Sequence, residues 1–187
     1  EDYVIIRLAR LTAHHDMGIK GISDSLLSDL INFFESRSLR ILISSESELG
    51  EKYMNYKMDI NSSHMHHILA GSKFFISDSQ SMSVESAILG VPSIRFSSFA
   101  GKISVLEELE HKYNLTFGIN PDYPDKLFKK LHNLFSVNNL NDQFKTRRDF
   151  MLNQKIDVSS FMYWFIESFP EGIEIMKTDN NYQNRFK

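Results

Sequence analysis

Residues 73 to 94 read Lys73-Phe-Phe-Ile-Ser-Asp-Ser-Gln-Ser-Met-Ser-Val-Glu-Ser-Ala-Ile-Leu-Gly-Val-Pro-Ser-Ile94, and this stretch decides the fold. Its first five residues form a short apolar run of strand type, and the polar residues that follow are typical of a helix start. Gly90 can end that helix, and Pro92 opens a second extended segment because proline cannot continue a helix. The order strand, helix, strand predicts one unit of a parallel α/β sheet.

The segments on both sides of this unit continue the alternation. Strands are predicted at residues 3–8, 39–43, 73–77, 92–96 and 116–118, with a brief edge strand at 56–60. Helices are predicted at about residues 24–36, 65–70, 80–89, 104–113, 125–135, 141–153 and 158–169. The 39–43 run is almost continuously hydrophobic, as in a strand that is buried on both faces. The pattern predicts the α/β class, with a Rossmann-like open parallel sheet and helices on both faces.

The composition is that of an ordinary globular chain. Of its 187 residues, 42% are hydrophobic and 24% are charged, and the formal net charge is −3. This balance gives no reason to expect nucleic acid as a partner. Cysteine is absent, which excludes disulfides and thiolate metal sites and fits a reducing compartment. We expect a cytoplasmic protein, with peripheral attachment to the inner membrane as an alternative for its full length.

We expect residues 1–170 to form one Rossmann-like domain that includes the C-terminal helices. Residues 171–187 are expected to be a mobile tail, because their last ten residues, 178–187, lack apolar periodicity. The sequence lacks an initiator Met and enters a strand almost at once. We therefore expect the C-terminal piece of a longer protein, whose N-terminal domain is absent from this chain.

The turn after the 73–77 strand is predicted to bind an anion. Backbone N–H groups at a helix start, together with the positive end of the helix dipole, attract phosphate or carboxylate groups. Hydroxyl and amide side chains crowd this turn, at Ser79, Gln80, Ser81 and Ser83. Ordinary capping of a strand-to-helix turn is the alternative interpretation.

Glu85 stands about one and a half turns inside the same helix. It is the only charged residue between Asp78 and Arg95. A carboxylate accepts hydrogen bonds from vicinal hydroxyls, so an acid beside a phosphate site suits a ribose attached to a diphosphate. Arg95 and Lys102, near the end of the neighbouring strand, are expected to add positive charge at the same sheet edge.

The segment Thr12-Ala-His-His-Asp16 follows the first strand and is open to two interpretations. One histidine, His14 or His15, can donate a hydrogen bond to a diphosphate or transfer a proton, with Asp16 orienting the ring. Exposed loop histidines are the equally weighted alternative. Side chains at consecutive positions point apart, so a metal shared by the two histidines is not expected.

A second group of histidines, His64, His66 and His67, invites a zinc hypothesis. No cluster of acids or cysteines at ligand spacing accompanies it, so a metal-dependent hydrolase is the least favoured function. We expect ordinary polarity at a helix start, with one of these histidines reaching the ligand cleft. No metal and no cofactor are expected.

Residues 78–94 resemble the nucleotide-sugar signature in the C-terminal domain of GT-B fold proteins, which include UDP-N-acetylglucosamine 2-epimerases and many glycosyltransferases. The epimerase pattern is Asp-Ser-Gly-Gly, then an acid, then Gly-x-Pro. The run is more similar to DUF354, an uncharacterised family of predicted glycosyltransferases with an Asp-Ser-Gln-Thr-Met run, a His-Asp pair and an Arg after Gly-Val-Pro-Ser-Ile. The matching features here are His15-Asp16, residues 78–82 and Arg95, and the similarity extends from about residue 3 to 118.

The resemblance implies a nucleotide-diphosphate sugar as ligand, with a UDP-sugar favoured. It implies that Ser79, Gln80 and Ser81 lie against the diphosphate and that Glu85 binds the ribose hydroxyls. The other implied positions are Asp78, Met82 and Arg95 for nucleotide-sugar binding and His14, His15 and Asp16 for catalysis.

Two departures argue against a standard epimerase. His14 matches the His of the epimerase Thr-x-His-Arg motif, but His15 replaces the arginine, and Gln80-Ser81 replaces the two glycines. The sequence thus predicts the donor-binding half of a glycosyltransferase, inactive by itself, which pairs with an N-terminal domain and can form a homodimer. A divergent epimerase and a non-catalytic nucleotide-binding module are the alternatives.

Overall fold

The computed structural model describes residues 2–10 and 20–187. The chain divides into two compact units, Glu1–Arg148 and Asp149–Lys187. The first unit therefore ends earlier than residue 170, the boundary that the sequence suggested.

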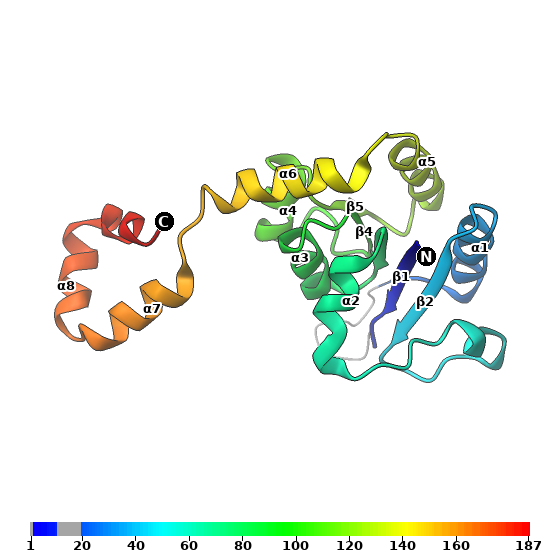
Figure 1. The fold of residues 1–187 in the computed structure, drawn as a ribbon, viewed down its shortest axis with the longest axis horizontal. Helices are drawn as coiled ribbons and strands as arrows, with labels where there is room; N and C mark the ends of the chain where they lie inside the picture. The colour runs from blue at the N-terminus through cyan, green and yellow to red at the C-terminus, as the bar shows by residue number, and fades with distance from the viewer. Residues whose placement is uncertain (1, 11–19) are drawn as a thin grey trace. The chain divides into compact units, whose positions relative to one another are not determined.

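The first unit is built on a five-stranded parallel sheet (Figure 1). Its strands are β1 (Tyr3–Leu8), β2 (Arg40–Ser45), β3 (Phe74–Ser77), β4 (Ser93–Phe96) and β5 (Phe117–Ile119). Their order across the sheet is β2-β1-β3-β4-β5. The predicted class, an α/β fold with an open parallel Rossmann-like sheet, is confirmed, and each of these strands lies within two residues of its predicted position.

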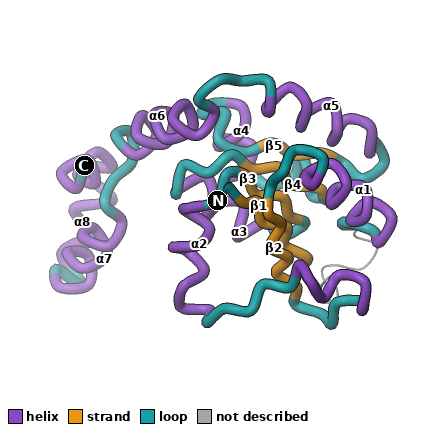
Figure 2. The backbone as a smooth tube through the Cα atoms, turned by 45° about the vertical axis from the view of Figure 1, so that its right-hand side comes forward, coloured by secondary structure: helices purple, strands orange, loops and turns teal. Residues whose placement is uncertain are grey.

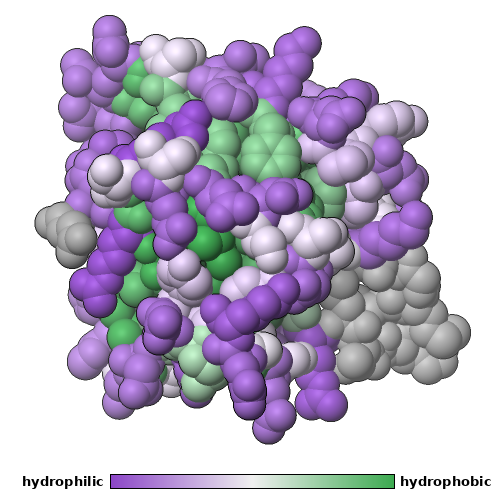
Figure 3. All heavy atoms as spheres, turned by 90° about the vertical axis from the view of Figure 1, so that its right-hand side faces the viewer, coloured by the Kyte–Doolittle hydropathy of each residue, from purple (hydrophilic) through white to green (hydrophobic). Residues whose placement is uncertain are grey.

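Helices cover both faces of this sheet, as Figure 2 shows. One face carries α1 (Asp24–Glu35) and α5 (Pro124–Phe135), and the other carries α2 (Met65–Gly71), α3 (Gln80–Ile88) and α4 (Ser104–His111). The side of the unit that bears α1 and α5 is viewed in Figure 3, where polar side chains surround a smaller apolar area.

The core lies on both sides of β1, the strand between β2 and β3. Because consecutive strand residues point to opposite faces, Ile5 and Ile6 are both fully buried, one on each side. Ile5 belongs to a cluster with Leu69, Phe75, Met82 and Val91 under α2 and α3. On the opposite face, aromatic rings join the sheet to α1 and α5, through the pairs Phe74–Phe135 and Phe34–Phe135.

The predicted edge strand at residues 56–60 is wrong. The chain forms a 3-10 helix over Glu51–Tyr56, and only an isolated bridge between Lys57 and Ile43 follows it in the described sheet. The reason is a tertiary anchor, since the buried Tyr53 hydroxyl donates hydrogen bonds to Asp24 at the start of α1. That contact holds the segment against a helix and away from the β2 edge.

Helix α6 (Leu140–Leu152) begins across the amino ends of the strands. Asn141 donates to the carbonyls of Ser72 and Lys73, just before and at the entry to β3. Gly90, before β4, has φ +72°, and a Cβ there would lie 3.2 Å from the Cα of Lys145. The backbone conformation therefore favours glycine, and the close approach of α6 leaves little room for a side chain. Helix α6 thus packs beside the chain segments that enter β3 and β4.

The second unit contains α7 (Val158–Glu167), α8 (Glu171–Thr178) and a 3-10 helix (Asn180–Phe186). The Trp164 ring stacks on Tyr182 at 4.6 Å and packs against Phe186. Residues 171–187, for which we expected a mobile tail, are thus helical over most of their length and supply two rings to this cluster.

No helix among the described residues is long and apolar enough to cross a membrane.

Candidate functional site

The carboxyl ends of β1 and β3 form the topological switch point of the sheet. From β1 the chain continues through α1 to β2 on one side, whereas from β3 it continues through α3 to β4 on the other. The two connections diverge and leave room between the strand ends, which is where open α/β sheets bind ligands. The residues that leave β3 here belong to the stretch that the sequence singled out.

Asp78 occupies this switch point and is 4% exposed. Its Oδ1 accepts a hydrogen bond from the Ala9 N–H at 2.6 Å, and its Oδ2 accepts one from the Ile22 N–H at 3.2 Å. The sequence suggested a helix-start residue or a ligand contact, but the carboxylate instead joins the exit of β1, the approach to α1 and the exit of β3. These hydrogen bonds to the backbone hold together the chain segments that surround the switch point.

Burial raises the pKa of the Asp78 carboxyl above its usual 3.8, and the two N–H donors offset only part of this effect. A raised pKa means that the folded protein binds a proton more tightly than the unfolded chain. The contribution of Asp78 to stability is therefore full below pH 3.8 and falls as the pH rises through the folded-state pKa.

We expect the stability of the wild type relative to Asp78→Asn to decline as the pH rises from about 3.8 and then to level off. Urea denaturation of both proteins at closely spaced pH values measures this difference. A difference that increases over the same range would contradict the assignment.

The start of α3 presents backbone donors to the switch point. Ser79 is the N-cap, but its side chain makes no capping hydrogen bond to a described residue. In α1, by contrast, the hydroxyl of the N-cap Ser23 accepts a bond from the Leu26 N–H. The first-turn N–H groups of α3 therefore lack a side-chain cap, as do those of α4 and α5, but only α3 begins at the switch point, where free N–H groups suit binding of an anion.

The side chains of this turn divide between the surface and the core. Ser79 Oγ lies 3.4 Å from Ser81 Oγ, and the Ser81 side chain is exposed. Gln80 Nε2 donates to the Asp78 carbonyl, while its Oε1 is buried without a partner in the described part of the chain. Met82, which the resemblance placed in the site, packs in the core with Ile5 and Phe75.

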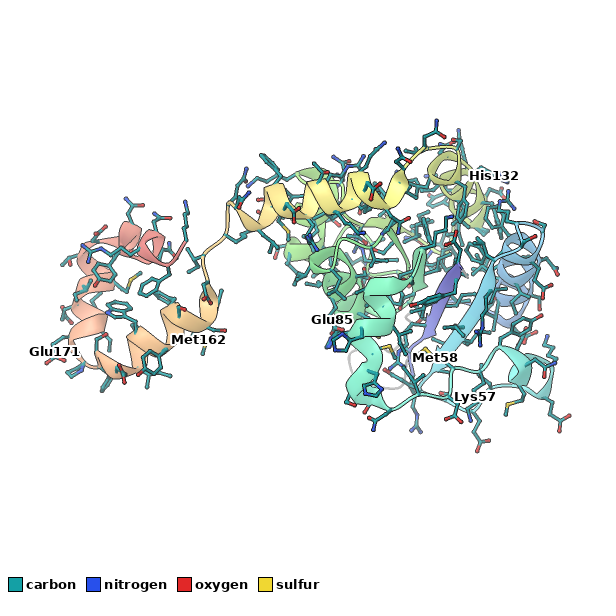
Figure 4. All side chains as sticks on the ribbon, viewed as in Figure 1. Lys57, Met58, Glu85, His132, Met162 and Glu171 are labelled. Atoms are coloured by element: carbon teal, nitrogen blue, oxygen red, sulfur yellow. The ribbon has the colours of Figure 1, made fainter. Side chains whose placement is uncertain are left out.

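Glu85 lies one turn after Ser81 on the same face of α3. Its Oε2 is 3.1 Å from Nε2 of His66, which belongs to α2, and the side chains are 37% and 65% exposed. Figure 4 shows Glu85 beside α2. His66 is thus the histidine of the 64–67 segment that meets the predicted ribose-binding acid. The sequence did not identify which one would do so.

Arg95, for which we expected a positive charge at the sheet edge, lies inside β4 and is fully buried. Its Nη2 is 2.7 Å from Glu110 Oε2 and 3.7 Å from Glu107 Oε1, both on α4. The same Glu110 oxygen accepts the Gly118 N–H of β5 at 2.8 Å. The charge of Arg95 is therefore neutralised inside the protein and does not face the α3 start.

Gly118 permits this arrangement by its lack of a side chain. A Cβ at this position would lie 2.8 Å from Arg95 Nη2 and 3.1 Å from the Ala100 side chain. Contacts under 3.0 Å are essentially never made by real Cβ atoms, so the guanidinium uses space that only glycine leaves free.

A second group of charged residues lies at the carboxyl ends of β1 and β2. The sequence analysis did not identify this group. Arg7 contacts Ser44 and Glu46, and Glu46 also accepts the Arg10 N–H at 2.8 Å. The Arg10 N–H and the Arg7 guanidinium hold the pKa of the Glu46 carboxyl below its usual value. A cavity of about 220 Å³ lies beside this group, lined by Leu8, Ser23, Ser45 and Tyr53 among others.

The proposed catalytic residues His14, His15 and Asp16 lie outside the described residues. Within the described ranges, no three His, Asp, Glu or Cys side chains gather as potential metal ligands. His64, His66 and His67 therefore do not form a metal site with neighbouring acids in that part of the chain.

Comparisons with known proteins bear on the fold alone. No family model matches the chain, and no curated protein matches its sequence. Seven solved chains are similar, among them the 2.2 Å crystal structure of a protein assigned as a UDP-N-acetylglucosamine 2-epimerase from Listeria monocytogenes. That match has a TM-score of 0.52 and 16% identity, and it covers 76% of this chain but 39% of the other. The chain shares a Rossmann-like α/β fold with part of that protein and spans well under half of its length.

Proposed function

We propose that this chain binds a nucleotide-diphosphate sugar and forms the donor-binding domain of a GT-B glycosyltransferase. The observation that carries the proposal is the start of α3 at the switch point, with uncapped backbone donors and the Ser81 hydroxyl one turn from the Glu85 carboxylate. The GT-B-like fold supports it. UDP-sugars are the favoured donors, and a separate N-terminal domain would supply the acceptor site.

The proposed site assigns one chemical task to each part of the turn. N–H groups of Gln80 and Ser81, with the Ser79 and Ser81 hydroxyls, would bind the diphosphate, helped by the helix dipole. Glu85 would accept hydrogen bonds from the ribose hydroxyls. Asp78 supports the turn through the backbone, and the buried Arg95 has no direct part in this form of the site.

Isothermal titration of the protein with UDP and UDP-N-acetylglucosamine tests the proposal directly. We expect binding of both ligands, with the uncharged nucleoside uridine binding more weakly because it lacks the diphosphate. Lack of any heat of binding at millimolar UDP would overturn the proposal.

Glu85→Ala is expected to weaken UDP binding by about 10- to 100-fold, the range for loss of hydrogen bonds to a charged group. Titration with UDP measures the change. Glu108→Ala is the matched control, because this acid lies on α4 and pairs with Lys112 at the surface. Equal affinities of the wild type and Glu85→Ala would remove Glu85 from the site.

The structural neighbour's assignment favours a divergent epimerase as the second candidate. The full-length protein incubated with UDP-N-acetylglucosamine separates the possibilities. Transfer of N-acetylglucosamine to an acceptor, with release of UDP as the leaving group, indicates a transferase, and conversion to the C2 epimer indicates an epimerase. Binding without either product indicates a non-catalytic module. We propose His14, His15 and Asp16 as the residues to replace first in an active preparation, and a homodimer as the assembly to test.

A further inference from the structure

His66 and Glu85 come from different helices and meet at the exposed rim of the switch point. They are 19 residues apart in sequence, and the contact between Nε2 and Oε2 is 3.1 Å. His66 belongs to α2 and Glu85 to α3, two helices that pack on the same core cluster through residues such as Leu69 and Met82. Packing of the two helices therefore brings the backbone positions of His66 and Glu85 within reach of this contact.

An unrestrained glutamate on a helix surface samples several rotamers and is well solvated. The His66 contact engages one carboxylate oxygen of Glu85 and leaves Oε1 as the acceptor for a ligand. Ser81, one turn earlier on the same face, places a hydroxyl on the diphosphate side of that acceptor. A carboxylate with a fixed orientation distinguishes better between ligands with and without the partner hydroxyl than a mobile carboxylate does. When the hydroxyl is missing, the fixed carboxylate cannot turn to hydrogen-bond with water instead.

We infer that His66 is a positioning residue that makes the site selective for ribonucleotides over deoxyribonucleotides. This inference rests on the proposed function, in which Glu85 binds the ribose. His66 does not touch the reacting part of the ligand; it orients the carboxylate that recognises the sugar hydroxyls. The ligand class is accordingly a ribonucleoside diphosphate with its hydroxyls free.

The test compares UDP with 2′-deoxy-UDP and 3′-deoxy-UDP by isothermal titration on four proteins. These are the wild type, His66→Ala, His66→Gln and the control His67→Ala, in which an exposed neighbouring histidine is replaced. We expect the wild type to prefer UDP over the weaker deoxy analogue by about tenfold, the effect of one charge-assisted hydrogen bond. His66→Ala should reduce that preference to about twofold, and His66→Gln should restore much of it by supplying an amide donor.

The outcomes separate the two proposals. UDP binding with an unchanged ribose preference in His66→Ala would overturn the role of His66 and leave the proposed function standing. A wild type that binds UDP and its deoxy analogues equally would also overturn it. Lack of UDP binding by the wild type would remove the proposed function, and the role of His66 with it. If His66 had only a structural role, its replacement would weaken the binding of all three nucleotides equally. Circular dichroism spectra of the variants would detect a loss of folding.

Discussion

Glu110→Ala is expected to lower the free energy of unfolding of the first unit by about 3 to 5 kcal/mol, the cost of leaving a buried charge without its partner. Arg95 is fully buried, and its Nε and Nη1 already lack partners among the described residues. Glu110 supplies the 2.7 Å contact to Nη2 and also accepts the Gly118 N–H. One substitution therefore leaves the Gly118 N–H without its acceptor and leaves the buried Arg95 cation with only the 3.7 Å contact to Glu107.

Urea denaturation followed by circular dichroism measures this loss. The control is Glu108→Ala on the same helix, which removes a surface pair with Lys112 and is expected to cost less than about 1 kcal/mol. The double variant Arg95→Met, Glu110→Met should recover part of the stability, because a buried pair replaced by apolar side chains no longer carries an unpaired charge. A loss no greater than in the control would contradict the buried pair.

Ile5→Ala is expected to destabilise the first unit by about 2 to 5 kcal/mol, the usual cost of truncating a fully buried large aliphatic side chain. Ile5 is 0% exposed on β1, an interior strand of the sheet, and packs with Leu69, Phe75 and Val91. Removal of its outer carbons loses the transfer free energy and leaves a cavity that the flanking strands cannot close.

The matched control makes the same chemical change at the surface. Ile88 is 47% exposed on α3, and Ala has the higher helix propensity, so Ile88→Ala should alter stability by no more than about 1 kcal/mol. Thermal or urea denaturation of both variants gives the comparison. Similar losses in the two variants would contradict the burial of β1 between β2 and β3.

The sheet could be predicted from the sequence because its signals are local. The predicted bounds of the first strand, Tyr3–Leu8, match those of β1. The end of α3 could be predicted from Gly90, because glycine readily adopts the positive φ found there. The 56–60 segment could not be predicted in the same way, since its course depends on the Tyr53 hydroxyl meeting Asp24, which lies 29 residues earlier.

The candidate site was predicted less completely, because side-chain partners depend on packing between elements. Asp78 reads as a cap in sequence, yet its acceptors serve Ala9 and Ile22, which are 69 and 56 residues away. The sequence analysis predicted that Arg95 would be a cation at the sheet edge. The residues near it in sequence do not indicate that Glu110 will pack against it. The His66 and Glu85 contact required α2 and α3 to be packed side by side.

The shared Glu110 oxygen also has a consequence for how the sheet assembles. The edge strand β5 attaches through Gly118 to a carboxylate that is itself held by Arg95 of β4. If α4 moved away, Arg95 would lose its carboxylate partner, and if β5 moved away, the Glu110 carboxylate would lose the Gly118 N–H. We therefore expect α4 and β5 to protect their amides from hydrogen exchange as one cooperative opening unit, so that the outermost strand does not fray independently.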